Sequence, residues 1–382
     1  MARLPTIERL APLLSRPPLT SAVLRLLLNL SFERAHRSAM LTAGLIPKLV
    51  QHLVTEGRPA ADETPTLCVL YHLSLDDRCK SQFPYTDCVP WLVQCLLGSS
   101  SPQPAPLALA ISLAGHRRNA QLFASSLEKL LERALRDADA LFLRLVRTVT
   151  QHGSSAHSTS LASRAEALCN ALMQQSSSAE SDFALECAST LAQLEGAHFE
   201  PLLDRLLPWI RSRLVEGPEE LLVPLVQLVA TVARSGETCA HAIVQQGLVA
   251  DLTDLLRARQ EDDQLVLQVA YAFDALVSCG GGGVRESLVR EGGQEVPAYL
   301  LDLLPDRNPE VGRVCGHALA LLAHHFPEWE RRLRETRFCW HNAQWLAVVQ
   351  SGEAPEEHEE GTCEQFLDRS DLLSNGSATS DP

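Results

Sequence analysis

Hydrophobic residues recur along most of this chain at intervals of three and four positions, with polar residues between them. That spacing places the hydrophobic side chains on one face of an α-helix, whereas a half-buried strand would require strict alternation. No two segments show the alternation of a strand pair. The spacing predicts eight principal helices, at residues 23–30, 66–73, 105–113, 140–149, 183–194, 222–232, 265–277 and 311–322.

A short phrase, a turn followed by an apolar helix start, recurs between these helices. Its copies lie at residues 44–47, 87–90, 206–208, 247–249 and 296–297. The prolines of the first two copies, Pro47 and Pro90, are 43 residues apart, within the ~40–47 residues typical of armadillo and HEAT units. The chain is therefore predicted to be all-α, an armadillo-like right-handed α-solenoid of about 7–8 repeats over residues 1–350. In such a fold each repeat buries its apolar face only against its neighbours.

Charge separates the end of the chain from the rest. Residues 351–382 contain nine acidic residues and one arginine, which is a net −8 of the total −14. This polar segment is predicted to be a disordered acidic tail. An acidic chain lacks the basic surface of a nucleic-acid binder, and no apolar run approaches the ~20 residues that a membrane helix requires. We therefore expect neither a nucleic-acid partner nor direct membrane insertion.

The residues with catalytic or metal-binding chemistry show no recognised pattern. The eleven cysteines lack zinc-site spacing, so they are interpreted as core thiols of a protein in a reducing cytosol. Residues 280–283 (four glycines) lack the Lys-Ser/Thr of a phosphate loop and are predicted to form a flexible turn. Asp76-Asp77 and residues 261–263 fall at predicted helix boundaries, and His324-His325 at a helix end. We expect no enzyme, no metal and no cofactor.

Polar residues at one place in the last helix of each repeat form a candidate protein-binding surface. In groove-binding armadillo proteins an asparagine at this place often holds a peptide backbone, and Asn29 fits it here. The later equivalents are His72, Ser112, Thr148, Gln193 and Thr231. The alternative interpretation is that these polar residues only form a helix face exposed to water. The candidate binding residues on this face are Asn29, His72, Arg117, Arg118 and Asn119.

Trp340 and Trp345 form a second candidate patch near the end of the repeats. The favoured interpretation is a cap that covers the apolar end of the last repeat. A binding surface is the alternative.

Several segments resemble one family in sequence and in order. The most specific is CVLYHLSLDDRCKSQFPYTDC at 68–88, whose Tyr-His pair and YTDC ending are not generic repeat residues. The others are LRLLLNLSF (24–32), GLIPKL (44–49), RRNAQL (117–122), QEDDQLV (260–266), PAYLLDL (297–303) and FCWHNAQWL (338–346). With these segments the chain resembles the kinesin-associated protein family, the non-motor accessory subunits of heterotrimeric kinesin-II. Family members are longer, so the resemblance is to a short or N-terminally truncated form.

The resemblance implies a non-catalytic adaptor. Such a subunit binds the tails of the two kinesin-II motor heavy chains and links them to cargo adaptor proteins in intraflagellar and other microtubule-based transport. It would act in the cytoplasm, on microtubules and in the cilium. The alternative is a general armadillo-repeat scaffold of the catenin type or a regulator of small G proteins.

Overall fold

The computed structural model describes residues 5–57, 59–99, 103–152, 161–174, 182–194, 198–291 and 295–342. The chain divides into two compact units, Met1–Phe326 and Pro327–Pro382. Within the described residues every regular element is a helix, and none of their helices is long and apolar enough to cross a membrane. The predicted all-α class is confirmed.

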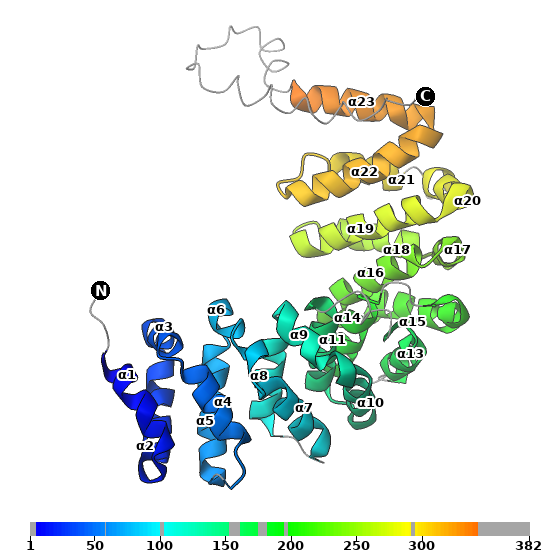
Figure 1. The fold of residues 1–382 in the computed structure, drawn as a ribbon. Helices are drawn as coiled ribbons and strands as arrows, with labels where there is room; N and C mark the ends of the chain where they lie inside the picture. The colour runs from blue at the N-terminus through cyan, green and yellow to red at the C-terminus, as the bar shows by residue number, and fades with distance from the viewer. Residues whose placement is uncertain are drawn as a thin grey trace, which may run out of the picture. The chain divides into compact units, whose positions relative to one another are not determined.

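One row of helices runs through the first unit (Figure 1). Each member packs against the next member in chain order, which is the neighbour-only contact of a solenoid. The members, here called the third helices, are α2 (Pro17–Ser31), α5 (Ala60–Leu73), α8 (Pro104–Ala114), α11 (Ala140–His152), α14 (Asp182–Leu191), α16 (Glu219–Arg234), α19 (Asp263–Cys279) and α22 (Pro309–His325). They coincide with the eight principal helices predicted from the spacing of apolar residues.

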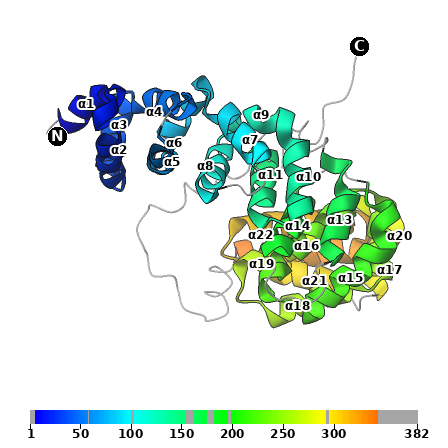
Figure 2. The same ribbon diagram turned by 90° about the horizontal axis from the view of Figure 1, so that it is seen from below.

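Further helices connect the members of the row (Figure 2). Those that directly precede a third helix are α4 (Leu45–Val54), α7 (Cys88–Gly98), α10 (Leu127–Asp137), α13 (Ala165–Gln174), α15 (Leu203–Glu216), α18 (Leu248–Ala258) and α21 (Glu295–Asp302). The first helices of the repeats are α3 (Arg34–Thr42), α6 (Asp77–Lys80), α9 (Arg117–Phe123), α17 (Glu237–Gln245) and α20 (Gly281–Glu286), and α1 (Pro5–Leu10) begins the described chain. Short 3₁₀ or π turns lie at Ala11–Ser15, Phe83–Tyr85, Ala124–Ser126, Glu200–Leu202 and Ser287–Glu291. The second unit contains α23 (Pro327–His341).

The recurrent turn phrase is explained by backbone conformation. Gly44 and Gly247 directly precede α4 and α18 and adopt φ values of +64° and +78°, which side chains with a Cβ disfavour. Pro47 and Pro90 lie in the first turns of α4 and α7, where an amide has no helical partner to lose.

Two local predictions are wrong. Pro208 does not mark a helix start, because α15 begins at Leu203 and contains Pro208 in its interior. Pro208 is exposed, so water can bond the carbonyl that its missing N–H leaves free. The glycine run is not a flexible turn either, because Gly281 begins α20. A Cβ on Gly281 would collide with the Glu237 carboxylate, so glycine allows a close approach there.

The core consists of aliphatic side chains, a few phenylalanines and thiols. The described cysteines are free, and Cys79, Cys88, Cys169, Cys187, Cys239 and Cys315 are buried. Burial raises the pKa of the Cys88, Cys169 and Cys315 thiols to about 12. These thiols therefore stay protonated at neutral pH and pack as small hydrophobic groups.

Candidate protein-binding surface

The predicted series of polar residues on the third helices is not uniform in the structure. Asn29 on α2 is exposed, His72 on α5 and Thr148 on α11 are half-buried, and Thr231 on α16 is buried. Gln193 lies just beyond the end of α14. Only part of the series is therefore available to a partner.

Several of these polar groups bond neighbouring third helices to each other. The Ser31 hydroxyl lies 2.6 Å from His72 Nδ1, and the Thr231 hydroxyl donates to the Ala192 carbonyl at 2.6 Å. The Ser74 hydroxyl donates to the Ser112 hydroxyl at 2.7 Å. We call these three contacts the seam; they join partners from successive repeats near the ends of the third helices.

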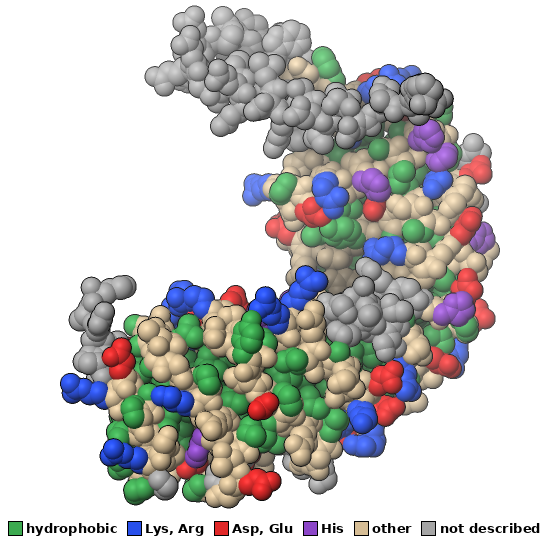
Figure 3. All heavy atoms as spheres, in the orientation of Figure 1, with side chains coloured by type: hydrophobic (Ala, Val, Ile, Leu, Met, Phe, Trp, Pro, Cys, Tyr) green, Lys and Arg blue, Asp and Glu red, His purple; other side chains and the backbone are tan. Residues whose placement is uncertain are grey.

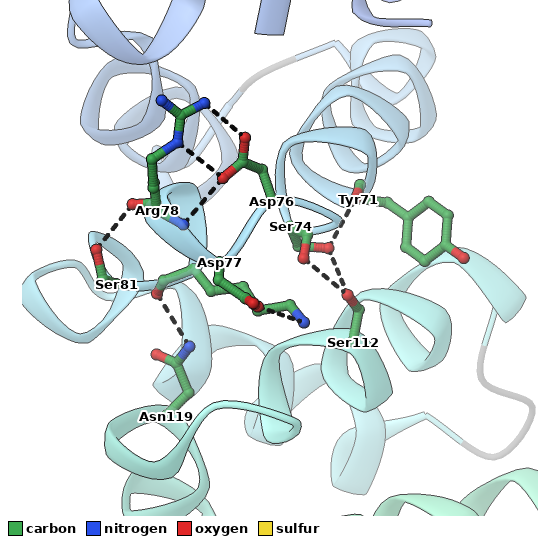
Figure 4. Close-up of polar contacts among 9 residues, drawn as sticks. Tyr71, Ser74, Asp76, Asp77, Arg78, Ser81, Ser112 and Asn119 are labelled. Atoms are coloured by element: carbon green, nitrogen blue, oxygen red, sulfur yellow. Dashed lines mark hydrogen bonds and ion pairs between the residues drawn. The ribbon is translucent and has the colours of Figure 1, made fainter. Parts of the chain in front are cut away.

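The most family-specific segment of the sequence forms the joint between two repeats (Figure 4). Asp76 caps α6 by accepting from the Arg78 amide at 3.0 Å, and it also accepts from the Arg78 guanidinium at 2.9 Å. The hydrogen bonds from Arg78 lower the pKa of the Asp76 carboxyl. Asp77 lies 3.4 Å from Lys80. These carboxylates serve the local fold, as predicted for a helix boundary.

The other predicted helix-end residues behave in the same way. Asp262 caps α19 and accepts from the amides of Gln264 and Leu265. His324 and His325 end α22, and His325 lies 2.9 Å from Arg285. Among the described residues, no group of three or more His, Cys, Asp or Glu side chains could hold a metal ion.

Arg117, Arg118 and Asn119 do not lie on a third helix, which corrects the predicted placement. They belong to α9, the first helix of its repeat. Arg117 and Arg118 are exposed, and Arg118 donates to the Tyr85 hydroxyl at 2.8 Å. Asn119 is fully buried and donates to the Lys80 carbonyl at 3.1 Å. The sequence alone could not show that this amide bonds a backbone group 39 residues away.

Asn119→Asp is expected to lower the free energy of unfolding by about 2 kcal/mol, because a buried carboxylate cannot donate to the Lys80 carbonyl. Urea unfolding followed by circular dichroism measures the change. The matched control is Asn170→Asp, which keeps the oxygen that accepts from Arg205 and should change stability little. Equal stability of the two variants would contradict the structural role of Asn119.

His72 predicts a pH dependence. Its ring packs on Phe32, with centroids 4.5 Å apart. Burial, and then the positive charge of Arg37, lower the pKa of His72 from 6.5. The unfolded chain therefore binds a proton more readily, so the stability contributed by neutral His72 is complete above pH 6.5 and is lost as pH falls through the lowered pKa. The melting temperature of His72→Gln should fall less than that of the wild type between about pH 7.5 and 5.5; parallel curves would refute this.

The two tryptophans of the second candidate patch fall at the edge of the described chain. Trp340 lies on α23, and Trp345 lies outside the described residues. Their roles as cap or binding patch stay predictions. In the same helix Trp329 is buried, and the Arg332 guanidinium lies 4.7 Å from its ring centroid.

A hollow of 490 Å³ lies among the third helices α5, α8 and α11, and we call it the third-helix hollow. It is lined by Tyr71, Pro104, Ala108, Ile111, Ser112, Leu141 and Arg144. The sequence carries no signal for it, because its walls come from three repeats and most of its residues are ordinary apolar ones. Hydrophobic side chains also gather on the face of the first unit over α2, α5 and α8 in the view of Figure 3. The surface of this part can therefore receive apolar side chains of a partner.

A family model described as kinesin-associated protein (KAP) matches residues 1–377. The chain belongs to the kinesin-associated protein family. The match confirms the family that the sequence segments resemble, and it spans both the seam and the third-helix hollow.

Two solved structures have a similar fold. One is described as an engineered protein and is 19% identical, with a TM-score of 0.69 over 86% of this chain and 81% of the other. A second comes from a structure described as a conserved phosphorylation switch in the interaction between cadherin and beta-catenin. It is 15% identical, with a TM-score of 0.55 over 83% of this chain and 60% of the other. At these identities they show the fold alone, which is armadillo-like, as predicted for this member of the KAP family.

Proposed function

We propose that this chain is a non-catalytic accessory subunit of a kinesin-II motor. It binds the tails of the paired motor heavy chains and links them to cargo adaptor proteins in microtubule-based and intraflagellar transport. The observation that carries the proposal is the family match over residues 1–377. By this proposal the protein works in the cytoplasm, along microtubules and in the cilium.

The physical form of the chain supports this role. A row of stacked repeats presents a long surface on which separate patches can hold two partners at once. Asn29 lies on α2, a repeat that does not line the third-helix hollow, and Arg117 and Arg118 lie on the first helix α9 outside its lining, so they are candidates for separate contacts. The net charge of −14 favours encounter with basic partner segments.

The test is binding of the whole chain to the paired tail segments of the two motor subunits, measured by calorimetry at low and raised salt. We expect saturable binding by a chain that circular dichroism shows to be helical. A folded chain that does not bind the tails at any salt concentration would overturn the proposal.

Variants distinguish the candidate residues. Asn29→Ala and the pair Arg117→Ala with Arg118→Ala should each weaken binding if those residues contact the tails. The matched control is Arg136→Ala, because Arg136 is an exposed arginine on α10, which is not a third helix, and pairs with Asp137. Equal affinity of all these variants would place the contact elsewhere on the chain.

A further inference from the structure

The third-helix hollow combines an apolar lining with a single cation. Pro104, Ala108 and Ile111 line it from α8, and Leu141 lines it from α11. Leu141 remains 47% exposed, which is unusual for a leucine on a helix that packs on both sides. Such a lining is stabilised when a partner's apolar side chain replaces water, by roughly 25 cal/mol for each Å² removed from water.

The cation is Arg144, which shares its carboxylate partner among the described residues with Arg147. That partner, Glu186, lies 3.9 Å from the Arg144 guanidinium. Arg147 already donates to both oxygens of that carboxylate, at 2.7 and 3.3 Å. The Arg144 side chain is 55% exposed. A second carboxylate, Asp139, is near the same end of α11 but accepts from the Leu141 and Phe142 amides.

The remaining polar groups of the lining are neutral. Ser112 is bonded within the seam to Ser74. The Tyr71 hydroxyl makes no hydrogen bond to another described residue, and its ring is directed away from the joint cluster (Figure 4). None of the described residues that line the hollow is acidic. The lining of the hollow therefore carries a positive charge, in a chain that is acidic as a whole.

We infer that the third-helix hollow holds an apolar anchor side chain of a partner peptide segment, and that a carboxylate close to that anchor in the partner pairs with Arg144. The occupant is thus an acidic–apolar segment, with the Tyr71 hydroxyl free to bond its backbone. Basic flanking residues in the same partner suit the acidic remainder of the chain. The inference rests on the proposed function, because it names the class of segment that the motor tails would present to this surface.

The probe is a panel of overlapping peptides of about 20 residues from the two motor tails, with binding to the whole chain measured by fluorescence anisotropy. The strongest binders should carry an aliphatic or aromatic residue within four positions of Asp or Glu. Changing that carboxylate to Lys should weaken binding by about tenfold or more, because a desolvated charge pair is lost and repulsion replaces it.

Variants of the protein test the same contact from the other side. Arg144→Gln and Leu141→Ser should each weaken the best peptide by about tenfold, as expected for residues at the centre of a contact. Ala108→Phe, which fills the hollow, should abolish binding. Arg144→Glu should regain affinity for the peptide whose carboxylate has become Lys.

The control substitutions lie on helices that are not third helices. Arg136→Gln on α10 and Val215→Ser on α15 alter exposed side chains that do not line the hollow. Unchanged affinity of the hollow variants, with the tails still bound, would overturn this inference and leave the proposed function in place. Failure of the wild-type chain to bind the paired tails would overturn the proposed function itself.

Discussion

Arg147→Met is expected to lower the free energy of unfolding by about 3 kcal/mol. Glu186 is buried to 8% exposure, and Arg147 supplies a two-pronged hydrogen bond to its carboxylate. Removing one partner of a buried ion pair leaves the other charge without compensation, which costs about 3–5 kcal/mol. The exposed Arg144 at 3.9 Å can recover part of that loss. Urea unfolding followed by circular dichroism gives the value.

The controls for Arg147 isolate the buried charge. Arg147→Met together with Glu186→Met should restore most of the stability, because a packed apolar pair has no charge to desolvate. Arg164→Met breaks the exposed pair with Glu132 and should change stability by less than about 1 kcal/mol. If Arg147→Met were as mild as Arg164→Met, the burial of Glu186 would be contradicted.

Phe273→Ala is expected to lower the free energy of unfolding by about 3–5 kcal/mol, which is as much as Arg147→Met or more. Phe273 lies on α19, which packs against both α16 and α22, and its side chain is fully buried. The loss combines the transfer of the ring to water with the cavity that it leaves, because the two neighbouring helices can close that space only in part. Thermal or urea unfolding measures the effect.

Phe338→Ala is the control for Phe273, because Phe338 on α23 is 57% exposed. It should change stability by less than about 0.5 kcal/mol. Phe273→Leu should fall between the two, since it leaves a smaller cavity. A mild effect of Phe273→Ala would mean that α19 is less tightly packed than the structure shows.

The row of third helices was predictable because it depends on a local signal. The spacing of apolar residues within one helix is sufficient to locate α5 or α19, whatever lies beside them. The position of Asp262 at the start of α19 was predictable for the same reason. Pro208 shows the limit, because proline inside an exposed helix surface looks in sequence like proline at a helix start.

The candidate site was predictable only in part, because it depends on contacts between repeats. Asn119 looks in sequence like a surface amide, and only its bond to Lys80 identifies it as structural. Arg144 and Arg147 are both arginines on α11. Arg147 bonds closely to Glu186, 39 residues further along the chain, whereas Arg144 lies 3.9 Å from the same carboxylate, and the sequence does not show this difference. The apolar lining of the hollow carries no motif at all.

The regular spacing of the seam has a consequence for how the chain folds. Ser31 and His72 are 41 residues apart, Ser74 and Ser112 are 38 apart, and Ala192 and Thr231 are 39 apart. The entropy lost on closing a loop depends on its length, so each of these contacts carries nearly the same cost. Low contact order of this kind favours fast folding. At a synthesis rate of about 5–20 residues per second, each repeat is completed roughly 2–8 seconds after the repeat before it. It can then dock on that predecessor, so that the protein can fold as it is made.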